Sequence, residues 1–171
     1  LILFWMASRK AELNRMIPAT PNKKGALSRW MPHCEWNEKL NTDLKNIPVL
    51  LSRISEDVLR LSGSTDEAFK VKLAVEEALS NAMHHGNRMD SSKYVTVFMK
   101  ADEQGIFVDI RDEGEGFDHE HIPDPTSRER LNQPCGRGIY LMRNLMDKVQ
   151  FYDSGRGVQI VKRFVSSHDK D

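Results

Sequence analysis

Three side chains that could act on a phosphorylated ligand recur at four-residue steps near the middle of the sequence. They are Glu77, Asn81 and His85, within the segment 75–86. On a helix with about 3.6 residues per turn, residues four apart lie on one face, so the three side chains form a line. A carboxylate can accept a proton, and an amide oxygen can bind a hard cation such as Mg²⁺. An ordinary polar helix face has the same pattern, so the line needs support from other segments.

Two neighbouring glutamates compete for the role of base in this segment. Glu76 lies about 100 degrees around the helix from Glu77. The four-residue step to Asn81 therefore selects Glu77 as the candidate base and Asn81 as the candidate metal ligand.

The second candidate site is Asp112-Glu113-Gly114-Glu115-Gly116, at the end of a predicted strand. An aspartate at a strand end can accept a hydrogen bond from an amino group such as that of adenine. Gly114 and Gly116 permit positive φ and close backbone approach. The same pattern occurs in ordinary turns, so alone it does not identify a ligand site.

The third candidate site is Gly136-Arg137-Gly138, at the start of a predicted helix. Free backbone N–H groups and the positive end of the helix dipole suit a phosphate chain there. A flexible helix entry would use the same residues. Neither a Walker sequence nor a strand-linked Gly-x-Gly-x-x-Gly is present, which argues against P-loop and Rossmann sites.

Two helices are predicted to precede and carry the first candidate site. Apolar residues at steps of three and four predict a helix that ends at Gly63, and they are Leu44, Ile47, Leu51, Ile54, Val58 and Leu61. Ser64 with Glu67 forms a predicted capping box, so a second helix should run from Thr65 to His85.

Alternating apolar residues predict strands, and turn residues connect them. A strand is expected from Cys34 to Thr42. A hairpin is expected from strands 93–100 and 106–112, and a second hairpin from strands 149–152 and 158–165. Between the two hairpins, a helix should begin near Gly138. The long segment 113–135 between the first hairpin and that helix is interpreted as a lid. The predicted fold is an α/β (α+β) two-layer sandwich, with a mixed, largely antiparallel sheet and helices on one face.

Composition sets the domain boundaries and excludes some partner classes. The 171 residues suit one domain, predicted at 34–166, with a poorly ordered N-terminal extension at 1–33 and a polar tail at 167–171. Lysine plus arginine and aspartate plus glutamate both number 25, so no overall basic field favours direct nucleic-acid or membrane binding. The apolar start is shorter than the roughly 20 residues of a membrane span. Two distant cysteines favour a reduced, cytoplasmic location.

In this order, the three candidate sites resemble the N, G1 and G2 boxes of the GHKL (Bergerat) ATP-binding fold of histidine kinases, gyrase-type ATPases and Hsp90. Within that superfamily, the sequences Glu77-Ala78-Leu79-Ser80-Asn81-Ala82 and Gly136-Arg137-Gly138-Ile139 resemble the anti-sigma-factor serine/threonine protein kinase family of bacterial partner-switching regulators. The resemblance covers about residues 36–165.

The resemblance implies roles for individual residues. Glu77 would be the base that acts on the serine hydroxyl of a partner protein, and Asn81 would ligate Mg²⁺ at the ATP phosphates. Asp112 would accept a hydrogen bond from the adenine amino group, in a pocket shaped by Gly114 and Gly116. The phosphates would be lined by Gly136, Arg137 and Gly138, with Arg137 also stabilising charge during transfer. His85 is expected to pack at the helix end.

The resemblance also implies partners and a reaction. The chain would phosphorylate a serine of a STAS-type antagonist (anti-anti-sigma) protein and, by exchanging partners, sequester a sigma factor. Family members commonly form homodimers, for which the first strand and helix could supply a surface. Two alternatives are a non-catalytic ATP-binding docking module and, disfavoured because no acceptor-histidine hairpin precedes the site, a histidine-kinase catalytic domain.

One departure from the family occurs in its last box, which often reads Gly-Thr. Here the residues are Gly157-Val158. Loss of the threonine hydroxyl predicts weaker or differently hydrated nucleotide binding. Gln159 is the nearest polar side chain that could replace the hydroxyl.

Overall fold

The computed structural model describes residues 33–116 and 137–164. Five strands form one sheet in the order β1-β2-β3-β5-β4. The strands are β1 (Cys34–Asn41), β2 (Tyr94–Asp102), β3 (Gly105–Asp112), β4 (Lys148–Tyr152) and β5 (Gly157–Arg163). All the described neighbouring strands pair antiparallel, so the predicted sheet is confirmed, and the described part of it contains no parallel pair.

The sheet register places apolar residues of successive strands opposite one another. Val97 of β2 lies opposite Ile110 of β3, and Ile110 lies opposite Val158 of β5. All three side chains are buried in one core cluster. Because side chains alternate between the two faces of a strand, this register sets one whole face of the sheet against the helices.

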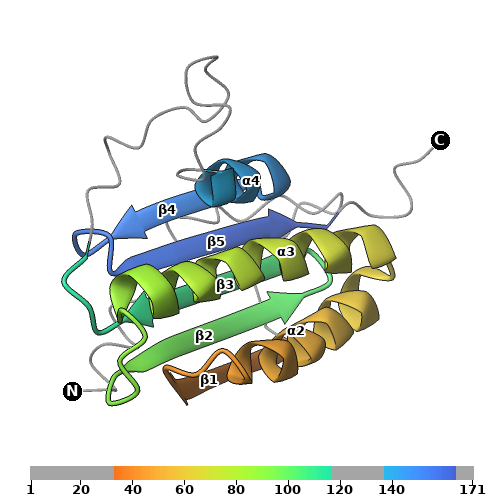
Figure 1. Cartoon of the computed structure of the whole chain (residues 1–171). Coiled ribbons are helices and arrows are strands. Elements are labelled where there is room, and N and C mark those ends of the chain that lie inside the picture. The colour runs from red at the N-terminus through yellow and green to blue at the C-terminus, as the bar shows by residue number, and fades with distance from the viewer. Residues whose placement is uncertain (1–32, 117–136, 165–171) are drawn as a thin grey trace. The chain divides into compact units, whose positions relative to one another are not determined.

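Three α-helices cover this face of the sheet (Figure 1). They are α2 (Asn46–Ser62), α3 (Thr65–Asn81) and α4 (Arg137–Leu145). Helix α3 contacts both α2 and α4, and it lies over β3 and β5 in the middle of the sheet. The predicted two-layer arrangement is therefore confirmed, and residues of α3 lie at the centre of the helical layer.

Helix α2 ends where its sequence predicts. Its buried residues Ile47, Leu50, Leu51, Ile54 and Val58 recur at the predicted helical spacing. Gly63 follows with φ of 65° and its N–H donates to the Leu59 carbonyl at 2.9 Å. A glycine adopts this left-handed conformation without the steric cost that a side chain would add, so it stops the helix.

The N-terminus of α3 has only half of the predicted capping box. The Ser64 hydroxyl accepts a hydrogen bond from the Glu67 N–H at 3.2 Å. The Ser64 N–H, however, donates to the Ser62 hydroxyl at 3.1 Å. The Glu67 side chain instead faces Lys70 and Lys162. The local sequence predicts the cap, but a neighbouring lysine and the distant Lys162 compete for the glutamate.

Helix α3 ends earlier than the predicted His85. Residues Ala82–Gly86 form a π-helical turn, labelled η1, in which the Asn87 N–H donates to the Ala82 carbonyl at 2.8 Å. Such turns insert one extra residue into a helix and often occur at functional sites. Glu77 and Asn81 therefore lie one α-helical turn apart, whereas His85 lies in the π-helical turn and leaves the predicted line.

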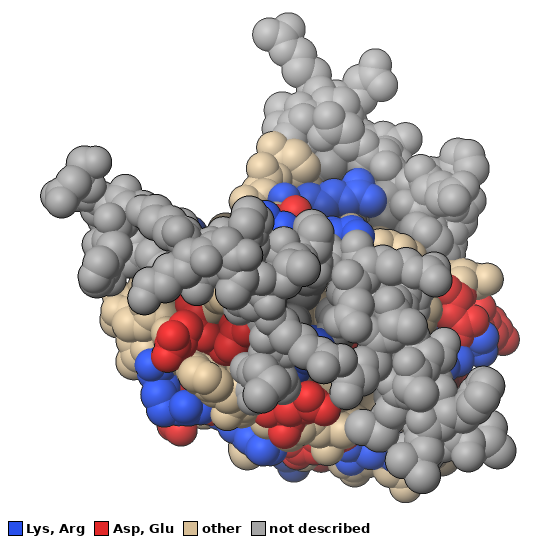
Figure 2. Space-filling view, turned by 180° about the vertical axis from the view of Figure 1, so that it is seen from behind, with Lys and Arg blue, Asp and Glu red and all other residues tan. Residues whose placement is uncertain are grey.

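Several predictions fall outside the described ranges. They concern the extension 1–33 except for His33, the lid beyond Gly116, Gly136, and the tail 167–171. The proposed domain boundaries therefore stay a prediction. No helix within residues 33–116 and 137–164 is long and apolar enough to span a membrane. On the side behind the helices, described basic and acidic side chains are interspersed (Figure 2).

Candidate functional site

The predicted base and metal ligand lie together at the C-terminal end of α3. The Asn81 Nδ2 donates to Glu77 Oε1 at 3.0 Å, and both residues are half-buried. Glu76 is exposed, so the helix faces are those that the spacing predicts. No ion pair to Glu77 is found among the residues that the structure describes, which leaves this carboxylate with a neutral partner.

The first turn of α4 lies directly against Glu77. A Cβ placed on Gly138 would overlap the Glu77 carboxyl group and lie 2.6 Å from its Cγ. Only a residue without a side chain permits this approach. The structure therefore brings the start of α4 beside the carboxylate, with the exposed Arg137 as the first residue of that helix.

The Asp112 carboxylate is buried at the end of β3. Its exposed fraction is 7%, and Oδ1 accepts a hydrogen bond from the Gly114 N–H at 2.8 Å. Burial raises the pKa of Asp112 above its ordinary value, and the Gly114 hydrogen bond partly opposes that rise. The second carboxylate oxygen has no hydrogen bond within the described residues, so an amino group of a ligand could donate to it.

Two glycines from distant segments close around this carboxylate. A Cβ on Gly86 would overlap the Asp112 carboxyl group, and a Cβ on Gly114 would overlap the Gly86 carbonyl. The end of η1 therefore lies against the turn after β3. Gly86 was not a candidate from the sequence, because its contact with Asp112 depends on how distant segments pack.

The β4–β5 turn supports the other side of the same segment. The Asp112 N–H donates to the Arg156 carbonyl at 3.0 Å. Gly116, with φ of 83°, lies against the Ser154 carbonyl, where a Cβ would overlap. Within the turn, Arg156 Nη2 donates to Asp153 Oδ1 at 2.5 Å. Arg156 was not a candidate from the sequence because its contact depends on strand order.

Two other expectations from the sequence are changed by the structure. The His85 side chain is exposed, so it does not pack into the core at the helix end. Val158 is buried opposite Ile110, on the face of the sheet under the helices. Gln159 follows it in the strand and therefore faces the other side of the sheet, so it cannot replace a hydroxyl at position 158.

The donor set at Glu77 fits a magnesium ion bound mainly by its ligand. No group of three histidine, cysteine, aspartate or glutamate side chains is placed to hold a metal within residues 33–116 and 137–164. Mg²⁺ commonly keeps several waters and is held by one or two protein oxygens plus phosphate oxygens. The Asn81 amide oxygen, beside the Glu77 carboxylate, meets that requirement.

Comparison with known proteins shows the family to which the chain belongs. The sequence model of the family described as Histidine kinase-like ATPase domain matches residues 40–164. An anti-sigma F factor of Anoxybacillus flavithermus is 31% identical over 116 residues, which are 64% of this chain and 79% of that protein. An anti-sigma F factor of Clostridium perfringens is 30% identical, over 64% and 81% of the two chains. A serine-protein kinase RsbW of Staphylococcus epidermidis is 30% identical, over 60% and 70%.

Proposed function

The chain belongs to the histidine kinase-like ATPase domain family, and from this premise we propose that it is an ATP-dependent serine/threonine protein kinase that acts as an anti-sigma factor. Its substrate is a serine of a STAS-type antagonist protein. The family membership implies ATP use. The relatives named anti-sigma F factor and serine-protein kinase RsbW support the choice of this activity over others of the family.

The observation that carries the proposal is the contact between two candidate sites. Glu77 and Asn81 share a hydrogen bond, and Gly138 at the start of α4 lies against the Glu77 carboxyl group. A base, a metal-binding amide and a helix N-terminus are thus within reach of one phosphate chain. A module that only docks a partner would need none of these three groups at the same place.

In the proposed reaction, Glu77 accepts the proton of the serine hydroxyl as that oxygen attacks the γ-phosphorus of ATP. The bond between the γ-phosphorus and the bridging β,γ-oxygen breaks, and ADP leaves with that oxygen. Backbone N–H groups at the start of α4 and the Arg137 guanidinium offset negative charge on the phosphates. Asn81 holds Mg²⁺, which when bound neutralises further phosphate charge.

The nucleotide base would lie at the other candidate site. Asp112 accepts a hydrogen bond from the adenine amino group, and Gly86 and Gly114 hold the backbone closely against its carboxylate, where no larger residue would fit. Gly116 shapes the same pocket, and Gly136 adds a backbone contact to the phosphates. A nucleobase with a carbonyl at the position of that amino group would meet a second acceptor, so ATP should be preferred to GTP.

Phosphorylation would set the choice of protein partner. A phosphate added to the antagonist weakens its binding to the kinase through charge repulsion and desolvation, which frees the kinase for a sigma factor. We place the protein in the bacterial cytoplasm, where such partners occur, and propose a homodimer in which β1 and α2 supply the contact surface.

A phosphotransfer assay tests the proposal directly. The full chain is incubated with γ-labelled ATP, Mg²⁺ and each antagonist-type protein encoded near its gene. We expect acid-stable label on a serine of one candidate. Tight binding of a candidate without any label would instead support the non-catalytic docking module. Acid-labile label on a histidine would support the histidine-kinase alternative, and either result would contradict the proposal.

A further inference from the structure

The side chain of Asn87, the residue that follows η1, is completely buried. Its exposed fraction is 0%. Its Nδ2 group donates to the Thr42 hydroxyl at 2.8 Å and to the Tyr94 carbonyl at 3.0 Å. Its Oδ1 accepts from the Glu113 N–H at 2.8 Å. The amide thus uses both donors and its acceptor, and it joins the end of η1 to Thr42, Tyr94 and Glu113.

One of these bonds lies within the Asp112 turn. Three successive N–H groups of that turn have separate partners: Asp112 donates to the Arg156 carbonyl, Glu113 donates to Asn87, and Gly114 donates to Asp112 Oδ1. The Glu113 N–H belongs to the peptide that directly follows Asp112. Its direction therefore sets the backbone angle ψ of Asp112 and the approach of Gly114 to the carboxylate.

We propose that Asn87 is a positioning residue of the nucleotide site, which orients the Asp112 carboxylate through the Glu113 N–H and links it to the end of the helix that carries Glu77 and Asn81. The interpretation of this site as a nucleotide site rests on the proposed function. The positioning of Asp112 itself rests only on the hydrogen bonds. Asn87 touches neither the ligand nor the reacting atoms in this arrangement.

Position 87 requires an asparagine for a physical reason. A buried polar group that loses its partner costs free energy, so the Glu113 N–H and the Tyr94 carbonyl need partners here, and the Thr42 hydroxyl, which donates to the Lys93 carbonyl, can accept as well. An amide is the short side chain that both donates twice and accepts. Aspartate would keep the acceptor but place a carboxylate against the Tyr94 carbonyl, and leucine would satisfy no partner.

The experiment compares Asn87→Ala with Thr42→Val. The threonine variant removes one hydrogen bond of Asn87 and a bond to the Lys93 carbonyl, but it leaves the bond to Glu113 intact. Both variants should lower the unfolding temperature. Only Asn87→Ala should weaken binding of a fluorescent ATP analogue, by about tenfold, and raise the KM for ATP while kcat changes less than about twofold. Exchange of the Glu113 amide proton should accelerate in this variant alone.

Equal changes of affinity in the two variants, or unchanged affinity and Glu113 exchange in Asn87→Ala, would overturn the inference. If Asn87→Ala does not fold, Asn87→Ser is measured in its place against the same predictions. Failure of the wild-type chain to bind ATP would count against the proposed function only. Glu113 exchange and the NMR shift of the Asp112 carboxyl carbon would then still decide whether Asn87 positions that side chain.

Discussion

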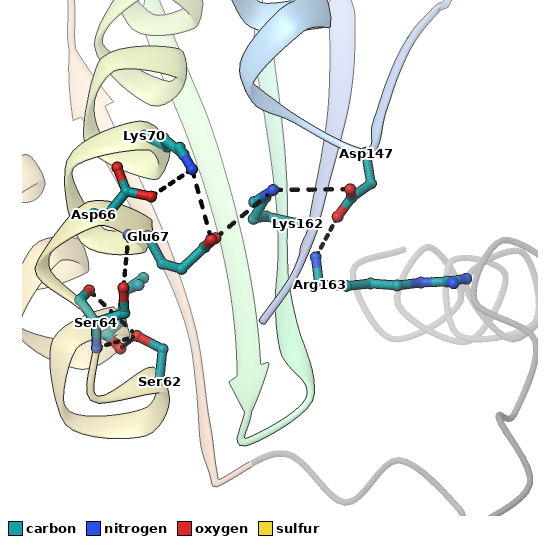
Figure 3. Close-up of polar contacts among 9 residues, drawn as sticks. Ser62, Ser64, Asp66, Glu67, Lys70, Asp147, Lys162 and Arg163 are labelled. Atoms are coloured by element: carbon teal, nitrogen blue, oxygen red, sulfur yellow. Dashed lines mark hydrogen bonds and ion pairs between the residues drawn. The ribbon is translucent and has the colours of Figure 1, made fainter. Parts of the chain in front are cut away.

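The two ends of α3 each hold a carboxylate that is at least half-buried, but the two carboxylates have opposite kinds of partner. At the N-terminal end, Glu67 lies between two lysines (Figure 3). At the C-terminal end, the described partners of Glu77 are the neutral Asn81 amide and the backbone at Gly138. The first arrangement compensates charge with charge. In the second, the Glu77 carboxylate has no cation beside it among the described residues and occupies the position that a Cβ of residue 138 would take.

The charge-compensated end connects three elements of the fold. The Lys162 Nζ atom of β5 lies 3.7 Å from Glu67 Oε2 of α3 and 3.8 Å from Asp147 Oδ1. Asp147 is the residue just before β4. Asp147 also accepts from the Arg163 N–H at 2.5 Å. Among residues 33–116 and 137–164, Glu67 Oε2 has no hydrogen-bond partner, so it interacts with Lys162 as a charge at a separation greater than a hydrogen bond. This end serves stability.

The difference between the two ends of α3 indicates which of them can accept a charged ligand. A carboxylate already paired with a lysine gains little from an added cation. A carboxylate with a neutral partner gains more, because Mg²⁺ and its phosphates bring the missing positive charge. We therefore propose that the ligand site lies at the Glu77 end, so substitutions at the two ends should separate catalysis from stability.

The strongest test of the comparison is Glu77→Gln. The amide keeps the size of the side chain but cannot accept the serine proton, so the phosphotransfer rate should fall by at least about 100-fold. ATP affinity should change much less. Rates are measured with γ-labelled ATP under single-turnover conditions.

The matched control is Glu76→Gln, on the exposed face one residue away. It should phosphorylate its partner at close to the wild-type rate. The opposite pattern, with loss of activity in Glu76→Gln and none in Glu77→Gln, would show that the wrong glutamate has been assigned as base.

A smaller effect is expected for Gly138→Ala. The added methyl would overlap the Glu77 carboxyl group, which is the mobile end of a side chain and can move away. The variant should fold, but with its base displaced, so the phosphotransfer rate should fall by about tenfold or more. Calorimetric unfolding and rate measurements are made on the same samples.

Gly63→Ala provides the control for a glycine substitution that acts on stability alone. Its Cβ would meet nothing within 4 Å, but its φ of 65° is strained for alanine. We expect a loss of about 1 kcal/mol in unfolding free energy with normal phosphotransfer. A Gly138→Ala variant that behaved in the same way would remove the inferred link between α4 and Glu77.

The opposite end of α3 should respond in stability alone. Lys162→Met leaves Glu67 and Asp147 without their shared cation, and the side chains of Lys162 and Glu67 are 13% and 9% exposed. A loss of about 1 kcal/mol in unfolding free energy lies between the values of exposed and buried ion pairs. Chemical denaturation measures this loss, and kcat should be unchanged.

The double variant Glu67→Gln, Lys162→Met is the control for Lys162→Met. It should recover part of the lost stability, because the nearly buried Glu67 carboxylate that has lost Lys162 is then replaced by a neutral amide. A large loss of activity at constant stability in Lys162→Met would contradict the separation of the two ends.

The smallest predicted effect is a pH dependence from Asp112. Burial raises its pKa above the unfolded value of 3.8, so between these two values the native state binds more protons than the unfolded state. Through this group, unfolding free energy should therefore rise as pH falls through the raised pKa. ATP affinity should fall over the same window, because a protonated carboxyl is a poorer acceptor for the adenine amino group.

Denaturation and ATP-analogue titrations between about pH 7 and about pH 4 measure these two opposing trends. Asp112→Asn serves as the reference because it lacks the titrating group. If the difference in stability between wild type and Asp112→Asn did not change with pH, the burial of Asp112 would not control its ionisation.

The elements that could be predicted from the sequence are those governed by neighbours along the chain. The stop of α2 at Gly63, the Ser64 cap and the Glu77–Asn81 hydrogen bond all span at most four residues. Helix geometry is constant, so spacing alone determines such contacts. Alternating apolar residues likewise predicted both hairpins, which are β2–β3 and β4–β5 in the structure.

The tertiary structure alone decided what surrounds these groups. Gly138 lies on Glu77, Gly86 lies on Asp112, and Asn87 bonds to Glu113, across separations of 61, 26 and 26 residues. The diversion of Glu67 from its capping role to Lys162 is of the same kind. Such contacts depend on strand order, on sheet register and on where each helix packs against the sheet. The spacing of residues within one segment does not determine these. The sequence by itself determined which groups could do chemistry, and packing decided which of them meet.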